Sequence, residues 1–201
     1  MDIVCLDLEG VLIPEIWINF AEKTGIEQLR LTTREVPDYD KLMTSRLEIL
    51  RQHNLKLSDI QDVISTMKPL DGAFEFLEEL RSMTQVVILS DTFSEFAQPL
   101  MKQLRWPMLW CNDLTVGENG MIEGYRMRLH DGKRQAIEAL RKLNFRTFAA
   151  GDSYNDLTMI HTADGGCLFR APQKILEKEP TLKLATTYDE FLQIIREFLQ
   201  S

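Results

Sequence analysis

Two acidic residues one position apart, Asp7 and Glu9, come at the end of an apolar segment near the N-terminus. Apolar residues from Ile3 to Leu8 predict a strand over residues 2–8 that is covered on both faces, as strands of a parallel sheet are. In open α/β sheets, ligands bind just beyond the carboxyl ends of the strands. Both carboxyl groups are therefore candidates for chemistry, although Asp7 could also simply cap the next turn.

Two further apolar segments end in polar residues. Ser90 closes QVVILS, and Asp152 and Asp156 lie in GDSYND, directly after the segment RTFAAG. Because the carboxyl ends of parallel strands face one edge of the sheet, we expect these side chains to converge on one crevice. Crowded carboxylates raise one another's pKa unless a cation neutralises them, and a site of oxygen ligands alone favours Mg²⁺ over zinc.

A lysine completes the set of residues that phosphoryl transfer needs. Lys133 lies in DGKRQAI, at the start of a predicted helix. A carboxylate can attack phosphorus while a metal ion, a hydroxyl and an ammonium neutralise the phosphoryl oxygens. Lysines in the first turn of a helix are commonly solvated, so this role depends on the neighbouring motifs.

The elements that must position these residues follow an α/β pattern. Helical spacing covers residues 15–24, and a mostly helical block continues to about Met67. Alternation of helix and strand resumes after KPLDG, with a hairpin signal at Asn119-Gly120. We therefore predict a doubly wound parallel sheet (Rossmann-like), formed by residues 1–14 and 69–201, with residues 15–68 as a helical insert and a small β-hairpin excursion.

The composition excludes several classes of partner. The 201 residues carry a net charge of -8, with 44% hydrophobic and 27% charged residues, which is ordinary for a globular protein. We expect no nucleic-acid partner and no membrane-surface partner, because nucleic acids and anionic membrane surfaces favour clustered Lys and Arg. We also expect no membrane span, because no apolar segment approaches the length that one needs.

Cysteine usage indicates the compartment. Cys5, Cys111 and Cys167 are predicted to be small buried thiols rather than disulfides or metal ligands. We therefore expect a reducing compartment, by default the cytoplasm. Trp106 and Trp110, around Pro107, are expected in the core or in a pocket wall.

The order DLEGV, Ser90, Lys133 and GDSYND resembles the four signature motifs of the haloacid dehalogenase-like phosphatases, over essentially the whole chain. The helical insert is similar to the cap of phosphoserine phosphatases. Glu9, in place of the usual second Asp, resembles the bifunctional phosphoserine phosphatase/homoserine phosphotransferase subgroup.

The resemblance implies a role for each matching residue. Asp7 would be the nucleophile that becomes an aspartyl phosphate, and Glu9 would protonate the leaving alcohol and then act as base for the acceptor. The phosphoryl group would be held by Ser90 and Lys133, with Asn155 touching phosphate or Lys133. Mg²⁺ would be bound by the Asp7 side chain, the Glu9 carbonyl and Asp152, with Asp156 in support.

In the cap, the resemblance implies that Glu15 meets the substrate ammonium and Arg46 its carboxylate, with Tyr39 and Met43 in the pocket wall. Arginine is suited to bidentate carboxylate recognition. On the residues alone, Arg46 could equally be an exposed helical side chain, and Glu15 could sit in the first turn of its helix.

Two motifs depart from the family pattern. Glu9 is one methylene longer than Asp, so its carboxyl group must fold back or sit further from phosphorus, and Val11 replaces a frequent Thr. Asp91-Thr92 replaces the usual Gly-Gly after Ser90, so a side chain there can contact the substrate in place of the backbone.

Alternatives remain open at this point. The substrate could be another small phosphorylated metabolite, and the acceptor could be water or homoserine. A receiver-like phospho-acceptor domain or a dehalogenase of the same fold are rival classes, and the protein could be a monomer or a homodimer.

Overall fold

The predicted strands form one parallel sheet with an antiparallel edge. The computed structural model describes residues 1–33, 35–36 and 38–201. Within these residues, seven strands pair in the order β4-β3-β2-β1-β5-β6-β7, and β4 alone runs antiparallel to its neighbour. The strands are β1 (Asp2–Leu6), β2 (Gln85–Phe93), β3 (Leu109–Val116), β4 (Ile122–Arg126), β5 (Arg146–Gly151), β6 (Gly165–Phe169) and β7 (Lys183–Ala185).

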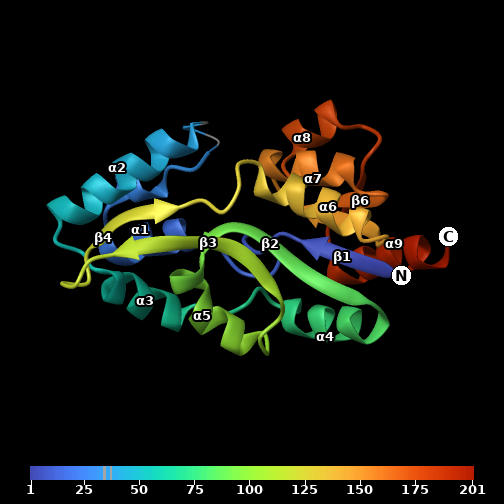
Figure 1. The fold of residues 1–201 in the computed structure, drawn as a ribbon, viewed down its shortest axis with the longest axis horizontal. Coiled ribbons are helices and arrows are strands. Elements are labelled where there is room, and N and C mark those ends of the chain that lie inside the picture. The colour runs from blue at the N-terminus through green and yellow to red at the C-terminus, as the bar shows by residue number, and fades with distance from the viewer. Residues whose placement is uncertain (34, 37) are drawn as a thin grey trace.

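Alternate residues of the central strand enter separate cores on the two faces of the sheet. Val4 and Leu6 of β1 pack in the core with α4 (Ala73–Met83) and α9 (Tyr188–Gln200). Ile3 and Cys5 pack in the other core, with α6 (Gly132–Lys142), α7 (Leu157–Thr162) and α8 (Gln173–Lys178). Helices thus cover both faces of the sheet, which confirms the predicted doubly wound architecture (Figure 1).

The residues between β1 and α4 are mainly helical, as the sequence predicted. They form α1 (Ile16–Thr24), the 3-10 helix η1 (Glu27–Arg30), α2 (Tyr39–Gln52) and α3 (Leu57–Thr66). Helix α5 (Ser94–Gln103) follows β2. Helices α1 to α3 lie at the end of the molecule away from both termini (Figure 1). We refer to residues 15–68 as the cap, and their separation as a domain stays a prediction.

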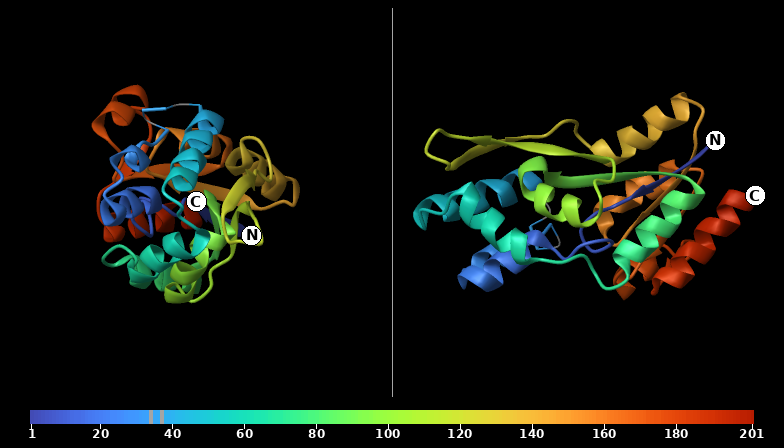
Figure 2. Two further views of the ribbon diagram at one scale, coloured as in Figure 1. Left: turned by 90° about the vertical axis from the view of Figure 1, so that its left-hand side faces the viewer. Right: turned by 90° about the horizontal axis from the view of Figure 1, so that it is seen from below.

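The predicted hairpin at Asn119-Gly120 is present and reaches the cap. Gly120 has φ +80, which suits a glycine in the turn between β3 and β4. The Leu57 amide donates to the Gly120 carbonyl over 3.0 Å, and the Tyr125 hydroxyl lies 2.5 Å from the Asp40 carboxylate of α2. The hairpin is the small excursion that the sequence predicted; it extends beyond the parallel sheet and also contacts the helices of the cap (Figure 2).

Several local predictions were wrong. Strand β2 continues past Ser90 to Phe93. Trp106, which was expected in the core or in a pocket wall, is 62% exposed, and its backbone has a φ of 53° just before β3. Cys5 and Cys167 are buried thiols, but Cys111 is only half-buried, since β4 pairs with β3 only from Asp113 onward.

No helix among the described residues has the length and apolar character needed to cross a membrane.

Candidate active site

The strand order brings the predicted motifs to one place. Strands β2, β1 and β5 are neighbours, so Ser90, Asp7 and Asp152 come from adjacent strand ends. They line a cavity of about 870 Å³, between the sheet and the cap. The wall also contains most of the other predicted site residues: Glu9, Glu15, Tyr39, Arg46, Asp91, Thr92, Lys133 and Asn155.

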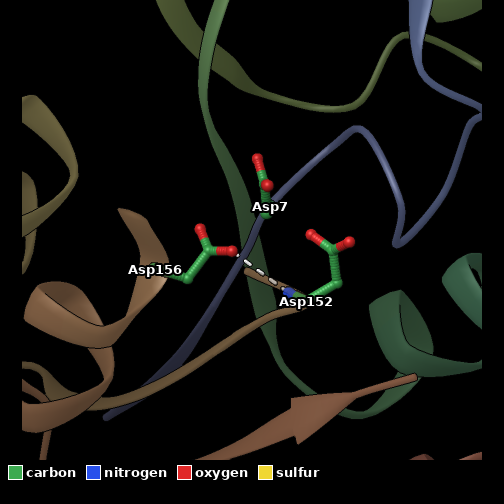
Figure 3. Close-up of side chains that lie close together, drawn as sticks. All are labelled: Asp7, Asp152 and Asp156. Atoms are coloured by element: carbon green, nitrogen blue, oxygen red, sulfur yellow. Dashed lines mark hydrogen bonds between the residues drawn. The ribbon is translucent and has the colours of Figure 1, made fainter. Parts of the chain in front are cut away.

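Three carboxyl groups gather at the base of this cavity (Figure 3). One oxygen each from Asp7, Asp152 and Asp156 lies within 4.8 Å of the others, and all three residues are buried. Asp156, in the 3-10 helix η2 (Tyr154–Asp156), is fully buried and accepts hydrogen bonds from the amides of Asp152 (3.1 Å) and Ser153 (3.0 Å). The backbone after β5 therefore fixes Asp156, which suits the predicted supporting position.

Lys133 is part of this cluster and not a surface residue. It lies in the first turn of α6 and is 5% exposed. Its Nζ lies 2.9 Å from Asp7 Oδ1 and 2.7 Å from Asp156 Oδ1. Burial lowers the pKa of Lys133, but the nearby carboxylates of Asp156 and Asp7 more than offset this and raise the pKa, so the ammonium stays charged.

The cluster carries an excess of negative charge. Burial raises the pKa of Asp7 well above its ordinary value, and Asp156 and Asp152 raise it further, while Lys133 opposes the shift. The cluster thus contains three carboxyl groups, and the ammonium group of Lys133 contacts two of them, those of Asp7 and Asp156. A divalent cation on these oxygen atoms would relieve the repulsion and the pKa shift, so the donor set fits Mg²⁺.

Two glycines allow the acids to approach the backbone. Gly10 has φ +78, and a Cβ on it would lie 2.4 Å from Asp152 Oδ2. A Cβ on Gly151 would lie 2.1 Å from the Asp156 carboxyl carbon. Any larger residue at either position would displace one of the clustered carboxyl groups.

The segment after the β2 apolar run contributes polar groups to the cavity. The Thr92 amide donates to Ser90 Oγ over 3.2 Å, and both residues are buried. The Asp91 carbonyl accepts from the Tyr39 hydroxyl at 3.2 Å, which ties the cap to the strand end. The Asn155 amide donates to the Asp91 carboxylate over 3.0 Å instead of meeting Lys133, because Asp91 supplies an acceptor that a glycine at that position would lack.

Glu9 is directed toward the cap. Its Oε2 accepts a 2.8 Å hydrogen bond from the amide of Ile16, the first residue of α1. Burial raises the pKa of Glu9 to about 7, and the charge of Glu15 adds to this shift. A carboxyl group with this pKa can both give and accept a proton near neutral pH.

Arg46 is buried rather than exposed on its helix. It is 7% exposed, its Nη2 donates to the Leu31 carbonyl over 2.7 Å, and its guanidinium carbon lies 4.4 Å from the centre of the Trp17 ring. Burial lowers its pKa to about 10, so it stays cationic at neutral pH. Its buried Nε has no hydrogen-bond partner among the described residues. A buried donor of this kind needs an acceptor, which a carboxylate in the cavity would supply.

Met43 does not line the cavity, contrary to the prediction. It is fully buried, and its sulfur lies 3.8 Å from Arg46 Nη1, so it packs behind the arginine. Leu42 stands in the wall instead, because successive helical residues point in different directions and Met43 faces the cap core. Sequence reasoning also missed Trp17, although a large aromatic residue two positions after Glu15 was an available signal.

The whole chain is similar to known proteins. A family model of haloacid dehalogenase-like hydrolases matches residues 1–164. Phosphoserine phosphatase ThrH of Pseudomonas aeruginosa is 54% identical over 201 residues, which are all of this chain and 97% of that protein. A phosphoserine phosphatase of Pseudomonas syringae pv. tomato is 55% identical over 201 residues, again all of this chain and 84% of the relative.

The fold is similar to solved structures as well. A crystal structure of a phosphoserine phosphatase in its apo form superposes with a TM-score of 0.76 at 20% identity, covering 99% of this chain and 98% of that one. The likeness therefore extends through both the sheet and the helices inserted after β1.

Proposed function

Because the chain belongs to the haloacid dehalogenase-like hydrolases, as its motifs indicated, we propose that it is a Mg²⁺-dependent phosphoserine phosphatase that also transfers the phosphoryl group to homoserine. The observation that carries the proposal is the placement of Lys133 and Asp7 below a cavity into which the cap brings Arg46. The names of the Pseudomonas relatives support the choice of phosphoserine.

The acidic cluster would hold the metal ion. Asp7, Asp152 and the Glu9 backbone carbonyl are the proposed ligands, with Asp156 in support. When bound, Mg²⁺ would neutralise the clustered carboxylates and the phosphoryl oxygens. The chain itself would supply the nucleophile (Asp7), the general acid (Glu9) and the ammonium group that contacts the phosphoryl group (Lys133).

In the first step, an Asp7 carboxylate oxygen attacks phosphorus and the bond between phosphorus and the serine oxygen breaks. Glu9 gives its proton to the departing oxygen, so serine leaves as a neutral alcohol. Lys133 and Ser90 hold the transferred phosphoryl group, as their positions beside Asp7 allow. The product is an aspartyl phosphate at Asp7 and an ionised Glu9.

In the second step, an acceptor occupies the place that serine left. Glu9 takes the proton of the acceptor hydroxyl, the new bond to phosphorus forms, and the bond to the Asp7 oxygen breaks. Water gives inorganic phosphate, and homoserine gives phosphohomoserine. Homoserine differs from serine by one methylene, which pockets discriminate by only about 1–3 kcal/mol.

The cap would select the amino-acid part of the substrate. Arg46 is buried and cationic, and its Nε has no hydrogen-bond partner in the part of the chain that the structure describes, which matches a substrate carboxylate. Glu15 lines the same cavity and complements an ammonium group. Tyr39 forms part of the wall through its bond to Asp91.

The experiment supplies phosphoserine with Mg²⁺, with and without homoserine, and follows inorganic phosphate and phosphohomoserine together. Release of phosphate from phosphoserine, faster than from phosphorylated metabolites without a free carboxylate, is the expected result for the hydrolase. Phosphohomoserine should appear as homoserine is raised. If it never appears at saturating homoserine, the transferase part is wrong and the phosphatase remains.

Other functions give different results in this assay. Another small phosphorylated metabolite as the physiological substrate would be turned over faster than phosphoserine. A dehalogenase would work after chelation of divalent cations, and a receiver-like domain would take up phosphate without catalytic release of alcohol. We retain the cytoplasm as the proposed compartment, supported by the three free cysteines.

A further inference from the structure

A hydrogen bond between two side chains crosses the end of the central strand. The Asn155 amide donates to the Asp91 carboxylate over 3.0 Å. Asp91 lies in β2 and Asn155 in η2, just after β5, and β1 lies between β2 and β5 in the sheet. The bond therefore spans the end of β1, which Asp7 follows, and both of its residues line the same cavity as Asp7.

The backbone of Asp91 is fixed from two sides. Its carbonyl accepts hydrogen bonds from the Tyr39 hydroxyl of the cap and from the Asn112 side-chain amide of β3, each over 3.2 Å. Asn112 is buried, and its side-chain oxygen accepts in turn from the backbone amide of Arg128. The Asp91 carboxylate therefore extends from a fixed point to reach Asn155, which is itself exposed.

The two ends of the Asn155 side-chain amide both have partners. Its oxygen accepts from the Ser153 hydroxyl, and its nitrogen donates one hydrogen to Asp91. The reversed amide would place its oxygen against the Asp91 carboxylate, so these contacts select one orientation. An amide nitrogen carries two hydrogens, and no hydrogen bond within the described residues engages the second one. This second N–H is left for a ligand in the cavity.

We propose that Asp91 is a positioning residue for Asn155, which it orients so that the second amide N–H donates to the phosphoryl group on Asp7. A donor fixed in advance stabilises the charge of the phosphoryl oxygens without having to reorient during the reaction. Glycine at position 91 would offer no acceptor, and the amide would then be free to turn over. This inference rests on the proposed function, because it needs a phosphoryl group at Asp7.

The charge of Asp91 has a second and opposite effect. The carboxylate repels the anionic oxygens of a phosphoryl group, so a substitution of Asp91 alone changes the repulsion and the orientation of Asn155 together. The two effects separate when Asn155 is removed in the parent and in Asp91 variants. The repulsion is the same with and without Asn155 and cancels in this comparison, whereas the orientation of Asn155 does not.

The probe is orthovanadate, an anion that adopts the five-coordinate geometry of a phosphoryl group in transfer. Its inhibition constant is measured against hydrolysis of 4-nitrophenyl phosphate with Mg²⁺. Asn155→Ala should raise this constant about tenfold in the parent, as expected for the loss of one hydrogen bond to a charged group. In an Asp91→Ala background, the same change should raise it less than about threefold, because the amide is no longer oriented.

Two further backgrounds are the controls. Asp91→Asn keeps a side-chain oxygen that accepts from Asn155, so the effect of Asn155→Ala should stay near tenfold. Asp189→Ala removes an exposed carboxylate of α9, outside the cavity, and should also leave the effect near tenfold. Circular dichroism and melting temperature establish that each variant is folded.

Product inhibition by serine separates orientation from a general loosening of the cavity. Serine has no phosphoryl group, so its inhibition constant should stay unchanged in Asn155→Ala and in Asp91→Ala. A hydrogen bond that only held the two loops together would, when lost, raise the constants for serine and orthovanadate alike.

The proposal is overturned if Asn155→Ala has no effect in the parent, or the same effect in the Asp91→Ala background. A serine constant that rises in step with that of orthovanadate overturns it as well. If the parent does not hydrolyse phosphoserine, the proposed substrate is wrong, and the alcohol of whichever phosphate ester it hydrolyses replaces serine. If it hydrolyses no phosphate ester, the proposed function is wrong. Calorimetry then gives the dissociation constant of orthovanadate for the same variants, so the role of Asp91 is decided independently.

Discussion

Lys133 Nζ lies 2.9 Å from Asp7 Oδ1, and the same ammonium lies 2.7 Å from Asp156. The pairing brings the first turn of α6 against the end of β1, so one cation contacts both the predicted nucleophile and an acid that the backbone holds in place. The two carboxylates therefore keep the buried Lys133 charged.

Asp7→Asn should abolish turnover while the protein stays folded, because it removes the nucleophile and keeps nearly the same volume. We expect kcat/KM for phosphoserine to fall at least about a thousandfold, a barrier increase of about 4 kcal/mol. Steady-state kinetics and circular dichroism check this. The exposed Asp71→Asn is the matched control and should behave as the parent. Residual activity within about tenfold of the parent would place the nucleophile elsewhere.

Removal of divalent cations should stop turnover and lower the melting temperature. Mg²⁺ at a hundred times its dissociation constant should add about 2.7 kcal/mol to the free energy of unfolding. Asp152→Asn should lose most of this Mg²⁺-dependent stabilisation, since it removes a proposed ligand, whereas the exposed Asp62→Asn should retain it. Melting scans with EDTA and with added Mg²⁺ measure the difference. Full turnover after exhaustive chelation would contradict the metal site.

Arg46→Ala should weaken substrates with a free carboxylate selectively. We expect kcat/KM for phosphoserine to fall by a factor equivalent to about 1.5–3 kcal/mol beyond any loss for phosphoethanolamine, which lacks the carboxylate. The exposed Arg51→Ala, on the same helix, is the control. Equal losses on the two substrates would assign Arg46 to packing against Trp17 or to the phosphate.

Glu9 should make the metal-free protein less stable as the pH rises. Its pKa is about 7 in the folded protein against an ordinary value of 4.5, so the folded state binds the proton more tightly than the unfolded state. The resulting stabilisation is complete below about pH 4.5 and is lost between there and about pH 7. Glu9→Gln should remove about 1–3 kcal/mol of this pH dependence, as urea unfolding in EDTA at several pH values will show. An identical pH dependence in the variant and the parent would contradict the shifted pKa.

The sheet and the convergence of its motifs could be predicted because they depend on local patterns. Apolar runs define the strands, and parallel strands bring their carboxyl ends to one edge, so Asp7, Ser90 and Asp152 follow without knowledge of any contact. The four motifs in order then identified the family.

The parts that could not be predicted depend on contacts between distant segments. The rotation of α2 about its own axis determines that Leu42, and not Met43, lines the cavity. That rotation is set by the packing of α2 against the rest of the cap. The bond from the Ile16 amide to Glu9 depends on where the cap begins relative to the sheet. Nor does any pattern around Asn119-Gly120 indicate that the turn will lie against Leu57.

The β3–β4 hairpin affects how the cap can move. The cap is joined to the sheet by the chain on either side of it and by the bond from Tyr39 to the Asp91 carbonyl, and the hairpin adds attachments through Leu57 and Asp40. Attachment at several separate points restricts a body to small rocking motions, so we expect no wide swing that would expose an aspartyl phosphate to bulk solvent. Shielding of this kind gives a dilute amino-acid alcohol time to compete with a vast excess of water. The loop that looks least related to the chemistry would then help to decide which acceptor receives the phosphate.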